Sequence, residues 1–273
     1  MGGLGLVFGL ILAVAYRFLR VQEDPRLEQV RDLLPGANCG ACGEPGCGGF
    51  AEKVVAGSKA PGGCTVASAA AIEAIADALG VEAGKEEKRV ARLHCAGGRS
   101  RAGQIAAYEG YEGCRAAHTV GGGGKGCAWG CLGLGDCQVA CNYDAIYMND
   151  DGLPVVIPEK CTACGDCVEA CPRYLFKIQP LSEKLLVQCS APLSGDAATA
   201  VCSVACDACG RCAQDAAPGL VTMKNNLPIV DYSAGGPASP QATLRCPTGA
   251  IQWVEEEQFS EQKLVRLKVV SNA

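Results

Sequence analysis

Aromatic side chains, histidine and excess positive charge are all scarce in this sequence. Phe, Trp and Tyr make up 5% of the 273 residues, and an ordinary globular chain of this length carries more large core side chains. The two histidines, His94 and His118, stand in no nucleophile–base pattern, so we expect both to be structural or solvated and the chain to have no substrate chemistry of its own. The formal net charge is −5 and no basic stripe carries interleaved aromatics, so nucleic acid is not an expected partner.

Complete nucleotide-binding motifs are missing as well. The stretch GGGGKG at 121–126 lacks the Gly-Lys-Ser/Thr ending of a phosphate loop, and GLGLVFG near the start does not fit the dinucleotide pattern. We interpret the first of these stretches as a flexible hinge.

Cysteine, by contrast, is abundant, with 20 residues, and glycine numbers 36. Most of the cysteines fall in C-x2-C or C-x3-C groups, a spacing that suits several thiolates on one metal centre and suits disulfide geometry poorly. Iron–sulfur clusters can replace part of an apolar core, and glycine lets the backbone approach them closely. Thiols of this kind persist in a reducing compartment, so we expect the bulk of the chain to face the cytoplasm.

The first twenty residues, MGGLGLVFGLILAVAYRFLR, are apolar and carry no charge before Arg17. The run is at the short end of what spans a bilayer, and it lacks the basic start and cleavage site of a signal peptide. We therefore expect residues 1–20 to form a single transmembrane anchor, with a buried helix as the alternative. Arg17, Arg20, Arg26 and Arg31 then predict a single-pass protein of the inner (plasma) membrane, with the rest of the chain on the cytoplasmic side.

Residues 24–75 are expected to form a small helical domain around a loop rich in Gly and Cys. Four cysteines can hold one [4Fe–4S] cluster here, three from the loop and one from further along: Cys39, Cys42, Cys47 and Cys64. Zinc is the alternative, but four-cysteine zinc sites tend to have two separated C-x2-C knuckles. Residues 68–92 look helical, and we group residues 76–125 as a helical linker with the glycine-rich hinge at its end.

Residues 126–180 carry the strongest signal, which is that of a two-cluster ferredoxin domain. The segment from Cys161 to Cys171-Pro172 matches the bacterial ferredoxin run, and a wider run precedes it. In such domains the fourth cysteine of each run binds the other cluster. The spacing predicts one cluster on Cys127, Cys131, Cys137 and Cys171, and a second on Cys141, Cys161, Cys164 and Cys167.

Residues 181–273 look like a degenerate second ferredoxin unit that holds a single cluster. LVTMKNNLPIVDYS at 220–233 echoes IYMNDDGLPVVIPE at 146–159, a repeat at about 74 residues. Ala216 stands where a cysteine for a neighbouring cluster is usual, while the cysteines for one cluster remain: Cys206, Cys209, Cys212 and Cys246. The sequence thus predicts an α+β chain with four [4Fe–4S] clusters, or about 16 iron atoms.

Four cysteines have no place in these runs. Cys95 and Cys114 are interpreted as small buried side chains or as a redox-sensitive pair. Cys189 and Cys202 precede the last run without a slot of their own, and their role stays open.

The motifs LPGANCGACGEPGCGGFA, GCLGLGDC and CTACGDCVEACP, with GGLGLVFG at the start, resemble the B subunit of the Rnf complex. That complex is a membrane-bound ferredoxin:NAD oxidoreductase that couples electron flow to sodium or proton translocation. The resemblance covers nearly the whole chain. It implies an electron-transfer subunit of a larger enzyme, which relays electrons from soluble reduced ferredoxin through [4Fe–4S] clusters to membrane subunits.

Two alternative functions stay open at this stage. The family's four-cysteine domain also occurs in corrinoid iron–sulfur proteins, so the chain could be an electron donor to a corrinoid methyltransferase. A zinc-rich interaction module is the other alternative, and the ferredoxin runs count against it.

Overall fold

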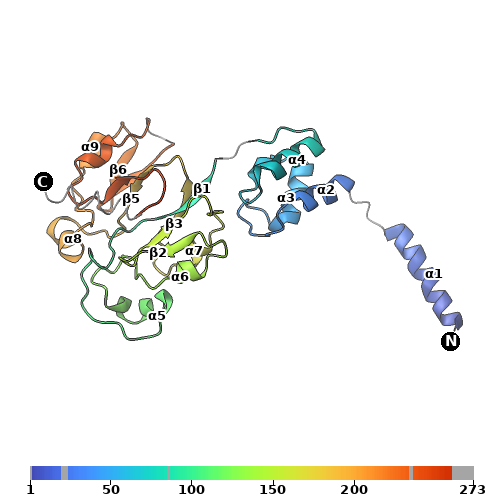
Figure 1. The fold of residues 1–273 in the computed structure, drawn as a ribbon, viewed down its shortest axis with the longest axis horizontal. Coiled ribbons are helices and arrows are strands. Elements are labelled where there is room, and N and C mark those ends of the chain that lie inside the picture. Colours follow the sequence, from blue (N-terminus) through green and yellow to red (C-terminus); the bar gives the residue numbers. More distant parts are fainter. Residues whose placement is uncertain (1, 20–23, 85–86, 234–235, 260–273) are drawn as a thin grey trace. The chain divides into compact units, whose positions relative to one another are not determined.

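The computed structural model describes residues 2–19, 24–84, 87–233 and 236–259 (Figure 1). The chain divides into two compact units, which we call the first unit, residues 1–86, and the second unit, residues 87–273. Each unit has its own apolar core and its own cysteine loops.

The helix at the amino end corrects the prediction of a transmembrane anchor. α1 spans Gly2–Leu19 and has 18 residues, with Arg17 in its last turn. At about 1.5 Å per residue it is about 27 Å long, less than the roughly 30 Å of a bilayer's hydrocarbon core. In the part of the chain that the structure describes, no helix is both long and apolar enough to cross a membrane. The anchor over residues 1–20, and with it the single-pass placement in the plasma membrane, was wrong.

Three α-helices and one short 3-10 helix build the rest of the first unit: α2 Pro25–Leu33, α3 Gly46–Val55, η1 Pro61–Gly63 and α4 Ala69–Leu79. Helix α2 begins where the Asp24 carboxylate accepts a hydrogen bond from the N–H of Arg26 at 2.9 Å. Helix α4 is capped in the same way by Ser68, and it ends at Gly80 in a left-handed conformation with φ of +65°.

The core of the first unit lies between α2, α3 and α4. Val30, Phe50 and Ile75 are almost fully buried there, and the cysteine loop packs against them. Burial of this apolar surface holds the loop that carries the cysteines in one place.

The second unit is built from two similar halves that follow one another along the chain. The first half contains β1 Arg89–Leu93, α6 Asp136–Val139, β2 Ile146–Met148, β3 Pro154–Val156, α7 Asp166–Ala170 and β4 Phe176–Pro180. The second half contains β5 Leu185–Val187, α9 Arg211–Asp215, β6 Val221–Lys224, β7 Leu227–Val230, α10 Gln241–Leu244 and β8 Ile251–Trp253. In each half the outer strands pair antiparallel, as do the inner two: β1 with β4, β2 with β3, β5 with β8 and β6 with β7.

The two halves keep a constant offset over most of their length. Helix α6 begins at Asp136 and α9 at Arg211, 75 residues later, and β4 and β8 begin at Phe176 and Ile251, which gives the same offset. The hairpin echo in the sequence corresponds to β2–β3 and β6–β7. In Figure 1 the first half runs in colour from teal at β1 to yellow, and the second half from gold to orange-red.

Strand β1 replaces the end of the helix that the sequence suggests over residues 68–92. Its residues pair with β4 from Arg89 opposite Pro180 to Leu93 opposite Phe176. Val90 and Ala91 are buried by this pairing, so a contact with a distant segment overrides the local helical pattern.

Three short helices lie in the segments that precede α6 and α9: α5 Cys114–Thr119, η2 Gly121–Gly124 and α8 Gly195–Val201. The glycine stretch expected to be a hinge forms η2, where all four glycines have φ between +58° and +71°. Lys125, the next residue, is buried with 8% of its surface exposed. The glycines therefore allow a left-handed turn that only Gly adopts at low cost, and this turn places the lysine inside.

Candidate metal centres

The four cysteines predicted in the first unit line one hollow beside Phe50: Cys39, Cys42, Cys47 and Cys64. The loop is shaped by Asn38, whose side-chain oxygen accepts the N–H of Cys47 at 2.9 Å while its amide donates to the carbonyl of Gly36 at 3.1 Å. Burial raises the pKa of Cys64, and the neighbouring Cys42 and Cys47 act in the same direction. The structure brings this predicted set together.

A second hollow is lined by Cys131, Cys137 and Cys171 together with Cys114, and Cys127 is not among its lining residues. Cys114 is the first residue of α5. The start of that helix is held by Asp136, whose carboxylate accepts the N–H of Cys114 at 2.8 Å and that of Arg115 at 3.0 Å. Because Asp136 directly precedes Cys137, its carboxylate connects the segment of Cys137 to the start of α5, where Cys114 lies.

Cys114 lies where the ferredoxin run lacks its middle cysteine. In the second half the run is Cys206-x2-Cys209-x2-Cys212, and at the 75-residue offset Leu134 stands opposite Cys209. Burial raises the pKa of Cys114, and a hydrogen bond with the Leu134 backbone works against that rise. The sulfur of Cys114 is therefore next to the position whose own side chain cannot bind a metal.

The third predicted set is brought together as the sequence groups it: Cys141, Cys161, Cys164 and Cys167. Burial raises the pKa of Cys167 to about 12, and the other three thiols of the set add to the rise. The sulfur of Cys141 also accepts the N–H of Ala145 at 3.4 Å. The loops after α6 and before α7 thus meet inside the core of the first half.

The fourth predicted set, in the second half, is also brought together: Cys206, Cys209, Cys212 and Cys246. Burial raises the pKa of Cys206 to about 11, and among the other contributions Cys212 and Cys246 act in the same direction.

Alanines occupy two of the four positions where the second half lacks a further set. At the 75-residue offset Ala216 and Ala242 are the counterparts of Cys141 and Cys167. Both pack into the apolar core of the second half, together with Leu220 and Ile251. Hydrocarbon therefore fills the space that cysteines line in the first half.

Cys127 lines another hollow, together with the three cysteines Cys95, Cys189 and Cys202. Cys95 and Cys114, interpreted from the sequence as small buried side chains or as a redox-sensitive pair, are both buried and line different hollows. The sequence pattern assigns neither Cys95 nor Cys114 to a set, because each lies far along the chain from the cysteines beside it in space. One feature of the sequence points to Cys114. Leu134 stands where the run of the second half has Cys209, so a ligand from another segment is needed there.

The donor sets fit iron–sulfur clusters. In a [4Fe–4S] cluster each cysteine binds a different iron, so the thiolates lie further apart than four ligands of one zinc ion at about 2.3 Å. Within residues 2–19, 24–84, 87–233 and 236–259, no three His, Cys, Asp or Glu side chains are placed to share a single metal ion. The raised pKa values of Cys131, Cys167 and Cys206 mean that thiols must lose protons when iron binds.

Two protein families match parts of the chain. The family described as "Putative Fe-S cluster" matches residues 34–66, and the "4Fe-4S dicluster domain" family matches residues 127–175. These ranges contain the first hollow and the cysteines of the two ferredoxin runs in the first half.

Similar proteins extend over most of the chain. It is 44% identical over 85% of its length to the B subunit of the Na(+)-translocating ferredoxin:NAD(+) oxidoreductase complex of Acetobacterium woodii, and covers 70% of that protein. It is 38% identical over 91% of its length to the B subunit of the proton-translocating complex of Clostridium ljungdahlii, and covers 88% of it. It is 34% identical over 92% of its length to the B subunit of the ion-translocating oxidoreductase complex of Methanosarcina acetivorans, and covers 95% of it.

The chain belongs to the B-subunit family of ion-translocating oxidoreductase complexes. The resemblance stated from its motifs is confirmed. The matches to two iron–sulfur families and the many cysteines show that this B subunit carries several [4Fe–4S] clusters. The names of its relatives show that it is one subunit of an oxidoreductase complex.

Proposed function

We propose that this B subunit relays electrons from reduced ferredoxin to other subunits of a ferredoxin:NAD oxidoreductase complex. The observation that carries the proposal is the adjacency of cysteine sets within the second unit. Cys137 and Cys167, which belong to neighbouring sets, are both buried in the same core. Thiols of two sets therefore lie within electrostatic reach of one another, as a relay between centres requires.

Bound [4Fe–4S] clusters supply one-electron chemistry, with potentials set by net charge, hydrogen bonds to sulfur and solvent exposure. The residues of the chain hold the sulfurs, bury them and adjust these three quantities. Arg173 is one such residue, because its guanidinium donates to the carbonyl of Cys127 at 2.9 Å and to that of Gly130 at 2.5 Å. Ligand assignment follows the sets that the structure assembles, so Cys114 takes the place predicted for Cys127 beside Cys131, Cys137 and Cys171.

The relatives differ in the ion that their names give, sodium in one and protons in another. Both names contain ferredoxin and NAD. We therefore propose ferredoxin as the electron donor. We propose that the other subunits of the complex determine which ion is transported.

The test uses the full chain, purified without oxygen. Reduced ferredoxin is added in steps, and the absorbance near 400 nm that iron–sulfur clusters give is expected to bleach. In parallel, Cys39→Ala is expected to lower the iron content by about four atoms per chain and to leave the electron paramagnetic resonance (EPR) signals of the second unit in place. Failure of ferredoxin to reduce an iron-loaded chain would contradict the donor assignment. Loss of all signals together in the Cys39 variant would contradict independent centres in the two units.

A further inference from the structure

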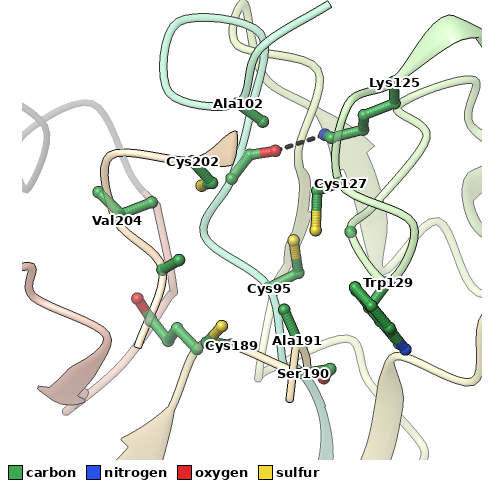
Figure 2. Close-up of a pocket in the computed structure, with 14 residues that line it drawn as sticks. Cys95, Ala102, Lys125, Cys127, Trp129, Cys189, Ser190, Ala191, Cys202 and Val204 are labelled. Atoms are coloured by element: carbon green, nitrogen blue, oxygen red, sulfur yellow. Dashed lines mark hydrogen bonds between the residues drawn. The ribbon is translucent and has the colours of Figure 1, made fainter. Parts of the chain in front are cut away.

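Four cysteines line the hollow between the two halves of the second unit. Only Cys127 among them was assigned to a ferredoxin run from the sequence. Figure 2 shows Cys95, Cys127, Cys189 and Cys202 arranged around it. A Cβ atom built on Gly97 would lie 2.9 Å from the sulfur of Cys202 and 3.8 Å from that of Cys95. Glycine at this position therefore keeps the space between two of the sulfurs open.

The four cysteines are two pairs related by the internal repeat. Cys95 is the second residue after β1, and Cys189 is the second residue after β5. Cys127 and Cys202 lie 75 residues apart, and each stands four positions before the first cysteine of its half's ferredoxin run. Each half thus contributes the same two positions to one hollow.

The hydrogen bonds around these sulfurs repeat as well. The N–H of Cys131, which opens the run in the first half, donates to the sulfur of Cys95 at 3.2 Å. Burial raises the pKa of Cys189, and a hydrogen bond with the backbone of Cys206, which opens the run in the second half, works against the rise. The duplicated halves therefore present their sulfurs to the hollow in the same way.

A buried cation lies at the same hollow without a carboxylate partner. The ammonium group of Lys125 donates to the carbonyl of Gly97 and to that of Cys131, each at 2.5 Å. No carboxylate pairs with it among the residues that the structure describes. Burying an ammonium without an anion is costly, and a cluster held by four thiolates carries the net negative charge that would balance it.

We propose that these four cysteines hold a fifth [4Fe–4S] cluster, placed where the two halves of the second unit meet. Small residues line the hollow beside the sulfurs, among them Gly97, Ala102 and Ala191. With Cys114 completing the second set, all 20 cysteines of the chain fall into five sets of four.

The fifth set joins centres that are otherwise separate. The sulfur of its Cys95 accepts the N–H of Cys131 in the second set, and its Cys189 is hydrogen-bonded with the backbone of Cys206 in the fourth. The sets of the second unit then form one continuous series, and the fifth lies between those of the two halves. This inference rests on the chain being an iron–sulfur electron carrier and extends the number and order of its centres.

The experiment counts iron and acid-labile sulfide in the full chain, reconstituted without oxygen. We expect about 20 iron atoms per chain, and about four fewer in each of Cys202→Ala and Cys189→Ala. Native mass spectrometry counts the clusters directly. The matched control is Ser203→Ala, because Ser203 is next to Cys202 but exposed, and it is expected to keep the full count.

A wild-type chain that saturates at about 16 iron atoms, with or without zinc, would overturn the fifth site. So would a Cys202→Ala variant that keeps as much iron as the wild type. The wild-type count decides the question even if a cysteine variant does not fold. A chain with about 16 iron atoms that ferredoxin still reduces would remove the fifth site and leave the proposed function standing. A chain with about 20 iron atoms that ferredoxin cannot reduce would support the fifth site and contradict the proposed function.

Discussion

The backbone N–H of Cys131 donates a hydrogen bond to the sulfur of Cys95, at 3.2 Å. The two residues line different hollows, so one peptide group connects two sets of cysteines. Two paramagnetic centres this close interact. In the fully reduced chain we expect broadened EPR signals, and we expect Cys95→Ala to remove one signal and narrow the spectrum of the centre on Cys131.

The control for this prediction is Cys39→Ala, which removes a centre from the first unit. It is expected to leave the broadening unchanged. A Cys95→Ala spectrum that retains the broadening of the wild type would mean that the neighbouring set holds no cluster.

A rescue experiment tests the role of Cys114. Cys114→Ala is expected to lose about four iron atoms, since the second set is left with three thiols. Adding Leu134→Cys to that variant is expected to restore the iron, because Leu134 occupies the position that Cys209 fills in the other half and the Cys114 sulfur already lies against its backbone. Iron analysis and EPR of both variants provide the measurement.

Leu134→Cys alone serves as the matched control and should keep the wild-type iron content. Full iron content in Cys114→Ala would show that this cysteine is only a buried side chain. No recovery in the double variant would refute the equivalence of Leu134 and Cys209.

Replacement of Lys125 by Met tests its part as the balancing charge. Removing a buried cation makes reduction of an adjacent cluster less favourable, so we expect the reduction potential of a centre in the second unit to fall by tens of millivolts, about 59 mV for each tenfold change in the one-electron equilibrium. A redox titration followed by EPR gives the potentials. Lys224→Met, at an exposed lysine in β6, is expected to leave them unchanged. Equal potentials in the wild type and the Lys125 variant would contradict the charge argument.

Short-range cysteine spacing predicts three groupings whose members the structure places close to one another, and their role as ligands stays a prediction. Ligands within one run, such as Cys161 and Cys164, lie on the same loop, so their spacing alone brings them together. Spacing alone does not predict that Cys114, from α5, lines the hollow of Cys131, Cys137 and Cys171, where Cys127 was expected. Residues 89–93 have a helical local pattern but form strand β1, because they pair with the distant strand β4. The apolar run at the start predicts the bounds of α1 nearly correctly. Its prediction that this helix spans a membrane was wrong, since none of the described helices is long and apolar enough.

Ala216 and Ala242 give the two halves of the second unit different dependence on iron. Where these alanines pack, the second half can collapse around hydrocarbon as the chain leaves the ribosome, before any metal is delivered. At the corresponding positions the first half has the thiols of Cys141 and Cys167, which repel one another once ionised and pack well only around a cofactor. Exposure to oxygen, which destroys such cofactors, should therefore loosen the first half more than the second, and proteases should cut between β1 and β4 first.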